Sequence, residues 1–370
     1  MPQTGDDPSR ASLEQRKNIC ASRLWHDTGF AVSQRCSPRQ TRWGRLVGFT
    51  VLALLLAVLG PWLVDEVSAA NTNRSQVRPR VMVLIFNPII ESQDNRRLVD
   101  LEGWSDPFAL NGEYAQVLKD ASRGFARYSI RSVVEVDAYP EKDNGHVFTD
   151  EEYLQCLMPD RGPNCALIID YPKLLRDYGI CDLSNKKKIS ELWLWGGPWF
   201  GFWEAVQAGP DPIITNGPPI VGTDCQRTLD IMGFSYERGV ADMVHDFAHR
   251  VEGNMDHVYG RRAPDETNPW NKFTLVDRDT PGRGGCGTVH DPVNAPPGEE
   301  YIYWNTQTVP SSCDDFLNYP DLTGTFVDVN CSTWGCTDLG YYQWWLGHLP
   351  RAHGVTDGKL NNWWAYVLHP

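Results

Sequence analysis

The sequence predicts an α/β fold with a mostly parallel or mixed sheet, flanking helices, and a loop-rich C-terminal half stabilised by disulfides. Short apolar runs of strand length alternate with segments in which apolar residues recur at helical spacing. From about residue 261 onward, proline, glycine, aspartate and asparagine are frequent, and few runs reach the length of a helix. A single apolar stretch of membrane-spanning length precedes the folded region.

Residues 46–64 are nineteen residues without a charge, which roughly matches a ~30 Å hydrocarbon layer at ~1.5 Å per residue. Eight lysines or arginines precede this stretch against four acids, and Asp65 and Glu66 follow it. The positive-inside tendency therefore predicts a single-pass signal-anchor, with residues 1–45 as a disordered cytoplasmic tail. Residues 65–79 form a linker, and residues 80–370 form an extracellular or periplasmic domain, which would be secreted if the N-terminal segment were cleaved after Ala70.

The folded region begins with alternating strands and helices. Residues 81–86 are a continuous apolar run, as expected for a strand buried on both faces. Further strands are predicted over residues 130–138, 165–171 and 189–195, and helices over residues 113–128, 339–346 and 359–368. The formal net charge of -13 argues against nucleic acid as a partner, because no basic surface of the needed size is present.

Residues 235–256 combine a helical pattern with metal-ligand chemistry. The apolar residues recur at three- and four-residue steps: Val240, Met243, Val244, Phe247, Ala248 and Val251. Ser235 is expected to cap the start of this helix and Gly253 to end it. His245 and His249 are four residues apart, so both imidazoles leave one face of the helix one turn apart.

The segment from His245 to His249 reads H-D-x-x-H and resembles the H-E-x-x-H motif of zincin-type metallopeptidases. The resemblance implies that both histidines bind zinc and that Asp246 stands where the family has its catalytic glutamate. Aspartate is one methylene shorter than glutamate, so Asp246 is expected to be a weakened general base. A catalytically inactive zincin-like domain that is retained for binding is a further hypothesis. The resemblance also implies an edge strand before the helix that holds an extended substrate.

A catalytic zinc needs a third protein ligand and an open position. The candidates are Glu252, which also suits a salt-bridge role beside a ligand, His290 on a glycine-rich loop near Cys286, and Asp256 or His257 if the helix ends at Gly253. The longer metzincin pattern places its third ligand where this chain has Met255. A structural role, with both helix histidines satisfied by hydrogen bonds, and a likeness to HD-type phosphohydrolases remain open.

Tryptophans are concentrated in residues 192–204, LWLWGGPWFGFWE. If exposed, Trp195, Trp199 and Trp203 would form a platform for sugar rings or apolar side chains, and if buried they would fill a core. The alternative function is therefore a cell-surface glycan-binding module, or a glycosidase that uses Glu191 or Glu204 as acid and base.

Eight of the ten cysteines follow residue 150, beyond the membrane segment. An even number in an outside domain predicts up to four disulfides, and the shortest loops available pair Cys156 with Cys165 and Cys331 with Cys336. Taken together, the sequence predicts a membrane-anchored zinc metallopeptidase-like protein that hydrolyses peptide bonds through metal-activated water.

Overall fold

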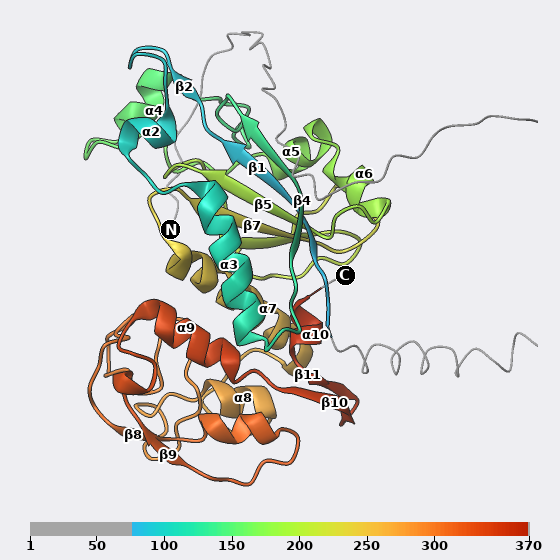
Figure 1. Ribbon diagram of the computed structural model, residues 1–370, viewed down its shortest axis with the longest axis vertical. Coiled ribbons are helices and arrows are strands. Elements are labelled where there is room, and N and C mark those ends of the chain that lie inside the picture. Colours follow the sequence, from blue (N-terminus) through green and yellow to red (C-terminus); the bar gives the residue numbers. More distant parts are fainter. Residues whose placement is uncertain (1–75, 369–370) are drawn as a thin grey trace, which may run out of the picture.

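The computed structural model describes residues 76–368, and its centre is a five-stranded sheet covered by helices on both faces (Figure 1). The strand order is β4-β1-β5-β7-β6, and the first four strands are parallel while β6 runs antiparallel to β7. Their bounds are β1 Arg80–Phe86, β4 Ser129–Val136, β5 Glu191–Gly196, β6 Ala205–Ala208 and β7 Leu229–Ser235. The predicted mixed α/β sheet is confirmed, with antiparallel pairing only at β6.

Two layers of side chains show why the central strands are apolar along their whole length. Val83 and Trp195 face a core shared with α3 (Pro107–Ala121) and α7 (Val240–Tyr259). Leu84 and Leu194 face a second core under α4 (Asp150–Cys156), α5 (Tyr171–Asp177) and α6 (Ile180–Asn185). Strands buried on both faces need apolar residues at successive positions, so the continuous apolar run predicted for β1 is explained.

α7 is longer than the sequence predicts and begins later. Ser235 is the last residue of β7, and Gly239 is the N-cap residue, whose N–H donates to the Asp242 carboxylate. Gly253 lies within the helix, at a position where a side chain would collide with the backbone of Thr215 and Ile214. The expected cap at Ser235 and the expected end at Gly253 are therefore wrong, since packing against a neighbouring loop overrides the local preference of glycine.

The strand that precedes α7 is not an edge strand. β7 lies between β5 and β6, and β6 forms the edge of the sheet. The outer side of β6 is covered by the chain that follows it: Gly217 and Ile220 donate N–H groups to the carbonyls of Ala205 and Gln207. The expected open edge for an extended substrate is therefore absent at this side of the sheet.

Three other predicted elements need correction. Residues 165–171 do not form a strand: Cys165, bonded to Cys156, lies in a turn, Ile169 makes an isolated bridge with Lys142, and Asp170 caps α5, which begins at Tyr171. The helix predicted over residues 113–128 is α3, which starts at Pro107 and ends at Ala121, before the left-handed Gly124. Residues 359–368 form β11 (Lys359–Asn362) and a short helix, α10 (Trp364–Val367).

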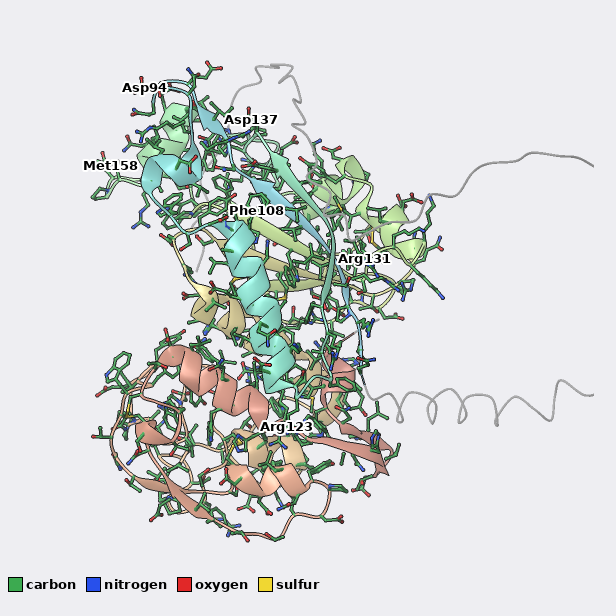
Figure 2. The ribbon with its side chains drawn as sticks, viewed as in Figure 1. Asp94, Phe108, Arg123, Arg131, Asp137 and Met158 are labelled. Carbon is green, nitrogen blue, oxygen red and sulfur yellow. A yellow bond between two sulfur atoms is a disulfide. The ribbon has the colours of Figure 1, made fainter. Side chains whose placement is uncertain are left out.

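The C-terminal half is loop-rich, as predicted, but it shares the core of α3 and α7 rather than having one of its own. Cys286, Tyr303 and Trp345 belong to the same buried cluster as Phe247. Figure 1 shows this half beneath the ends of α3 and α7, and Figure 2 labels Phe108 and Arg123 near the two ends of α3. The remaining elements are β2 Ile89–Ile90, β3 Arg96–Arg97, α2 Leu98–Glu102, α8 Pro269–Thr274, β8 Val309–Ser311, β9 Val327–Val329, α9 Asp338–Gly347 and β10 Arg351–Thr356, with 3-10 turns at Cys313–Asn318 and Cys331–Thr333.

All eight cysteines of the folded region are paired. The disulfides join Cys156 to Cys165, Cys181 to Cys225, Cys286 to Cys313 and Cys331 to Cys336. The prediction of four disulfides and both of the short-loop pairs are confirmed.

The predicted tail, the predicted membrane segment and most of the predicted linker lie outside the described residues. The last residues of that linker are already part of the fold, since Val77 is buried and bridges to Ala126. Among residues 76–368, no helix has the length and apolar character needed to span a bilayer.

Candidate metal centre

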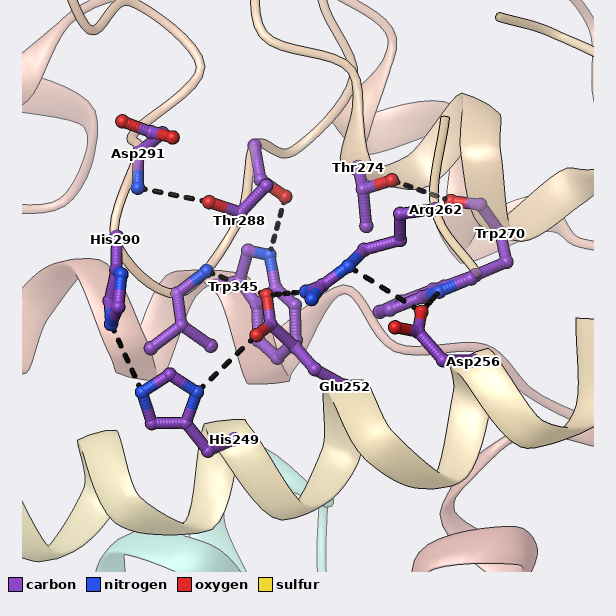
Figure 3. Close-up of polar contacts among 12 residues, drawn as sticks. His249, Glu252, Asp256, Arg262, Trp270, Thr274, Thr288, His290, Asp291 and Trp345 are labelled. Carbon is purple, nitrogen blue, oxygen red and sulfur yellow. Dashed lines mark hydrogen bonds and ion pairs between the residues drawn. The ribbon is translucent and has the colours of Figure 1, made fainter. Parts of the chain in front are cut away.

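Three histidines from two distant segments meet above the N-terminal half of α7. A ligand nitrogen from each of His245, His249 and His290 lies within 4.8 Å of the other two. Nε2 of His290 is 3.0 Å from Nε2 of His249 (Figure 3), and the rings of His245 and His290 are nearly parallel with centroids 5.3 Å apart. We call these three residues the histidine cluster.

Glu252 fixes the orientation of the His249 ring. Its carboxylate lies 3.4 Å from Nδ1 of His249, accepts the backbone N–H of Val289 at 3.1 Å and pairs with Arg262. An ionised carboxylate only accepts hydrogen bonds, so Nδ1 of His249 carries the ring proton. Nε2 of His249 therefore presents a lone pair to the cluster.

A chain of tyrosine hydroxyls fixes His245 in the same way. The Tyr303 hydroxyl donates to the carbonyl of Val289 at 2.9 Å, so Tyr342 must donate its proton to Tyr303 across 2.6 Å. The Tyr342 oxygen then accepts from Nδ1 of His245 at 2.8 Å. This leaves Nε2 of His245 unprotonated, so contacts at their outer nitrogens leave both helix histidines with an unprotonated nitrogen directed into the cluster.

One nitrogen–nitrogen distance in the cluster is close to that expected around a zinc-sized ion. Two nitrogens at ~2.0–2.1 Å from a tetrahedral ion are about 3.3 Å apart. The 3.0 Å between Nε2 of His249 and Nε2 of His290 is close to that value. Because His249 presents a lone pair, this contact requires a proton on His290 or a cation shared by both rings. A shared cation would also satisfy the lone pair of His245, which a single proton between the other two rings does not.

His290 is positioned by the loop that carries it. Cys286, four residues earlier, is buried and bonded to Cys313, and the Tyr341 hydroxyl donates to the carbonyl of Thr288 at 2.7 Å. Tyr301 donates its backbone N–H to the carbonyl of His290 at 2.7 Å, and its exposed ring lies against the imidazole at 4.5 Å between centroids. The loop is therefore anchored on both sides of the histidine.

The electrostatics favour neutral His245 and His290 rings and a charged Glu252. Burial, together with the nearby rings of His249 and His290, lowers the pKa of His245 to about 3. Burial also lowers the pKa of His290, and His249 adds to that effect. Burial by itself would raise the pKa of Glu252, but the contacts with His249 and Arg262 outweigh it and bring the pKa to about 2.

Two carboxyl groups lie beside the cluster. Glu204, from the loop before β6, and Asp246 approach a nitrogen of His245 within 4.8 Å. Oε2 of Glu204 is 3.6 Å from Nε2 of His249. Burial raises the pKa of Asp246 well above its usual range, and the charge of Glu204 contributes. The two carboxyls therefore experience different surroundings although they flank the same ring.

The other predicted ligands do not point into the cluster. Glu252 contacts the outer nitrogen of His249, on the opposite side of that ring from His290 (Figure 3). Because α7 continues to Tyr259, the chain does not fold back at Gly253. Asp256 instead accepts from the Trp270 indole at 2.7 Å, and His257 is exposed.

The tryptophans of residues 192–204 mostly fill the core. Trp195 is fully buried and donates to the Asn111 side chain at 2.9 Å, so it offers no exposed platform. Trp199 and Trp203 are half-buried, and the Arg161 guanidinium lies 4.4 Å from the Trp199 ring centroid. The predicted tryptophan-rich cluster is confirmed as an aromatic core, and of the three residues of the predicted platform only Trp199 and Trp203 are partly exposed.

Glu191, one of the two predicted glycosidase carboxylates, is buried under α7. It pairs with Arg250 at 3.0 Å, and Arg250 also pairs with Asp230 at 2.7 Å. Glu191 and Glu204 therefore belong to different environments, one a buried ion-pair network and the other the cluster. A surface cavity of about 330 Å³ lies elsewhere, between the ends of α3 and α9, and is lined by Asp120 and His348.

Sequence reasoning missed the residues that orient the ligands. Tyr303 and Tyr342 have no motif around them, and Arg262 lies in a turn after α7. The sequence predicts Glu204 only as a glycosidase carboxylate. The one local signal for it is that it ends the glycine- and tryptophan-rich segment directly before β6.

The chain was compared with known protein families, curated proteins and solved structures, and it matches none of them.

Proposed function

We propose that this protein is a zinc-dependent hydrolase resembling the zincin-type metallopeptidases, with His245, His249 and His290 as the protein ligands. The observation that supports it is the convergence of three imidazoles, two of which direct an unprotonated nitrogen inward because Glu252 and Tyr342 hold their outer nitrogens. Three histidines with an open fourth position are a ligand set of catalytic zinc sites.

When bound, zinc in such a site polarises a carbonyl and activates water. The residues of the chain supply the rest of the chemistry. Asp246 and Glu204 lie beside His245, and one of them accepts the proton of the attacking water. Glu252 and Tyr342 keep the ligand rings in place and do not take part in proton transfer.

We further propose that the folded domain works outside the cell, attached through residues 46–64. Four disulfides, which pair every cysteine of residues 76–368, support an oxidising compartment. Peptides are the proposed substrates, on the resemblance to zincins alone.

The experiment is metal analysis of the purified full-length protein. We expect about one zinc per chain, lost in the double substitution His245→Ala/His249→Ala and in His290→Ala. His257→Ala is the matched control, because His257 is an exposed histidine on the same helix outside the cluster. Zinc-dependent release of fluorescent peptides from labelled casein, abolished by a chelator, would then establish hydrolysis.

A wild-type protein that binds no zinc after incubation with the metal would remove this proposal. A protein that binds zinc and cleaves neither labelled casein nor other peptides would be a metal-binding domain without peptidase activity.

A further inference from the structure

Two carboxyl groups lie beside His245, and the H-D-x-x-H motif alone does not determine which of them would act as the general base. Asp246 stands at the motif position of the catalytic residue, whereas Glu204 comes from a segment about forty residues earlier. Both lie within 4.8 Å of a His245 nitrogen. Their exposure and their hydrogen bonds distinguish them.

Asp246 is enclosed by protein. Only 4% of its surface is exposed, and its Oδ1 is buried without a hydrogen-bond partner. Adjacent residues on a helix point about 100° apart, so Asp246 leaves α7 in a different direction from His245 and has a short side chain with which to return. Its carboxyl group is therefore poorly placed to meet a water molecule that arrives from solvent.

Glu204 is the more exposed of the two carboxyl groups. About a third of its side chain is exposed (31%), and Oε2 lies 3.6 Å from Nε2 of His249, the nitrogen that the Glu252 contact turns inward. The Asn216 amide donates to the same Oε2 at 2.8 Å and orients the carboxylate. The backbone carbonyl of Glu204 accepts the N–H of Gly233 at 3.1 Å, which ties the residue to the sheet.

The loop before Glu204 is itself held firmly. The ammonium of Lys142, a fully buried residue, donates to the carbonyls of Leu167, Trp199 and Phe200 at 2.9, 2.6 and 3.0 Å. Gly201 packs so closely on this group that a Cβ there would lie 2.3 Å from the Leu167 carbonyl oxygen. A carboxylate on a fixed loop, next to the inward nitrogens, meets the geometric requirement for a general base.

From this geometry we infer that Glu204, and not Asp246, is the catalytic base of the site. The inference rests on the proposed hydrolase function. In the reaction, the oxygen of water bonds to the peptide carbonyl carbon while one water proton passes to the Glu204 carboxylate. The carbon–nitrogen bond then breaks, the departing amine takes that proton, and Glu204 returns to its ionised form. Water is thus added across the bond, and no other reactant is consumed.

The test uses zinc-loaded full-length protein and acetohydroxamate, a small zinc-binding acid whose hydroxyl group must hydrogen-bond to a base at the open position. Glu204→Gln retains the shape of the side chain but removes its charge. We expect wild-type zinc affinity in this variant and acetohydroxamate binding weakened roughly tenfold to a hundredfold by calorimetry, as loss of a hydrogen bond to a charged group predicts. Hydrolysis of labelled casein should fall at least about a hundredfold.

Asp246→Asn is the competing variant and should weaken acetohydroxamate less than Glu204→Gln. Glu237→Gln is the matched control, because Glu237 is a partly exposed carboxylate just before α7 that pairs with Arg238 rather than with the cluster. It should leave zinc binding and acetohydroxamate affinity unchanged.

Several results would overturn the inference. These are unchanged acetohydroxamate affinity in Glu204→Gln, a larger loss in Asp246→Asn, no acetohydroxamate binding to the zinc-loaded wild type, or loss of zinc in Glu204→Gln, which would make Glu204 a ligand. All of these presuppose zinc in the wild-type protein. Absence of zinc there would instead reject the hydrolase proposal itself.

Discussion

The histidine cluster is held by a helix on one side and by loops on the other. α7 carries His245 and His249, whose relative position follows from one turn of regular helix. His290 and Glu204 lie on irregular segments, and each segment is pinned by a buried cross-link. For His290 the cross-link is the Cys286–Cys313 disulfide, and for Glu204 it is the Lys142 ammonium.

Helix and loop residues of the cluster are held in place by different interactions. Backbone hydrogen bonds within α7 place His245 and His249 relative to each other, so no distant contact is needed to set their spacing. A loop has no repeating hydrogen-bond pattern, so a side chain on it is placed only if distant residues hold the backbone. Substitutions of the cross-links should therefore disturb the loop side of the cluster and leave the helix side formed.

The largest effect is expected from the disulfide at the His290 loop. Cys286→Ala/Cys313→Ala opens a link between residues 27 apart in sequence, which by loop-closure entropy costs about 3 to 4 kcal/mol of unfolding free energy. We expect this loss in urea denaturation, together with weaker zinc binding in a chelator competition assay. Cys331→Ala/Cys336→Ala, with a separation of only 5, should cost about 2 kcal/mol and spare zinc binding. Equal zinc affinity in the two variants would contradict the role assigned to the first disulfide.

Lys142→Met should have the next largest effect. The substitution removes the donor to three carbonyl groups around a buried ammonium. Because these acceptors lose their hydrogen bonds, we expect the free energy of unfolding in urea to fall by about 3 kcal/mol. Lys186→Met is the control, because Lys186 forms an exposed pair with Asp182 whose loss should cost less than about 0.5 kcal/mol. Similar stability in both variants would show that the Lys142 cross-link contributes little to the Glu204 loop.

Gly253→Ala tests the packing of the helix side. Alanine is favoured over glycine in a helix by about 1 kcal/mol, but a Cβ at Gly253 would lie 2.5 Å from Cα of Thr215. Overpacking against backbone outweighs the gain, so we expect a net loss of about 1 to 2 kcal/mol in thermal or urea unfolding. Gly112→Ala in α3 meets no atom within 4 Å and should instead stabilise by about 0.5 to 1 kcal/mol. The same sign at both positions would contradict this packing argument.

Tyr342→Phe should have the smallest effect on the fold and a specific effect on the metal. It removes the acceptor for Nδ1 of His245 while leaving the ring in place, and loss of such an outer hydrogen bond lowers metal affinity about tenfold or more. Tyr366→Phe makes the same chemical change at a hydroxyl that accepts from the Leu360 backbone. Zinc titration should therefore separate the two variants, and identical affinities would indicate that the tyrosine chain does not orient His245.

Local patterns predicted much of the framework. The apolar runs at β1, β4 and β5, the amphipathic pattern of α7 and the two short disulfide loops are properties of neighbouring residues, and each is present. The prediction of a strand over residues 165–171 is wrong because a short apolar run is compatible with several kinds of buried segment, not only with a strand. The predicted cap at Ser235 and the predicted end at Gly253 are wrong because local preferences do not include contacts with residues far along the chain.

What the sequence by itself determined is the pair of histidines one helical turn apart, since that spacing depends on backbone geometry alone. Only the tertiary structure brought His290 to them across about forty residues and turned their outer nitrogens toward Glu252 and Tyr342. It also left Glu204 partly exposed beside His249 while enclosing Asp246. These contacts join residues far apart in the chain. Their distances are set by packing and disulfides, which leave no periodic signal in the sequence.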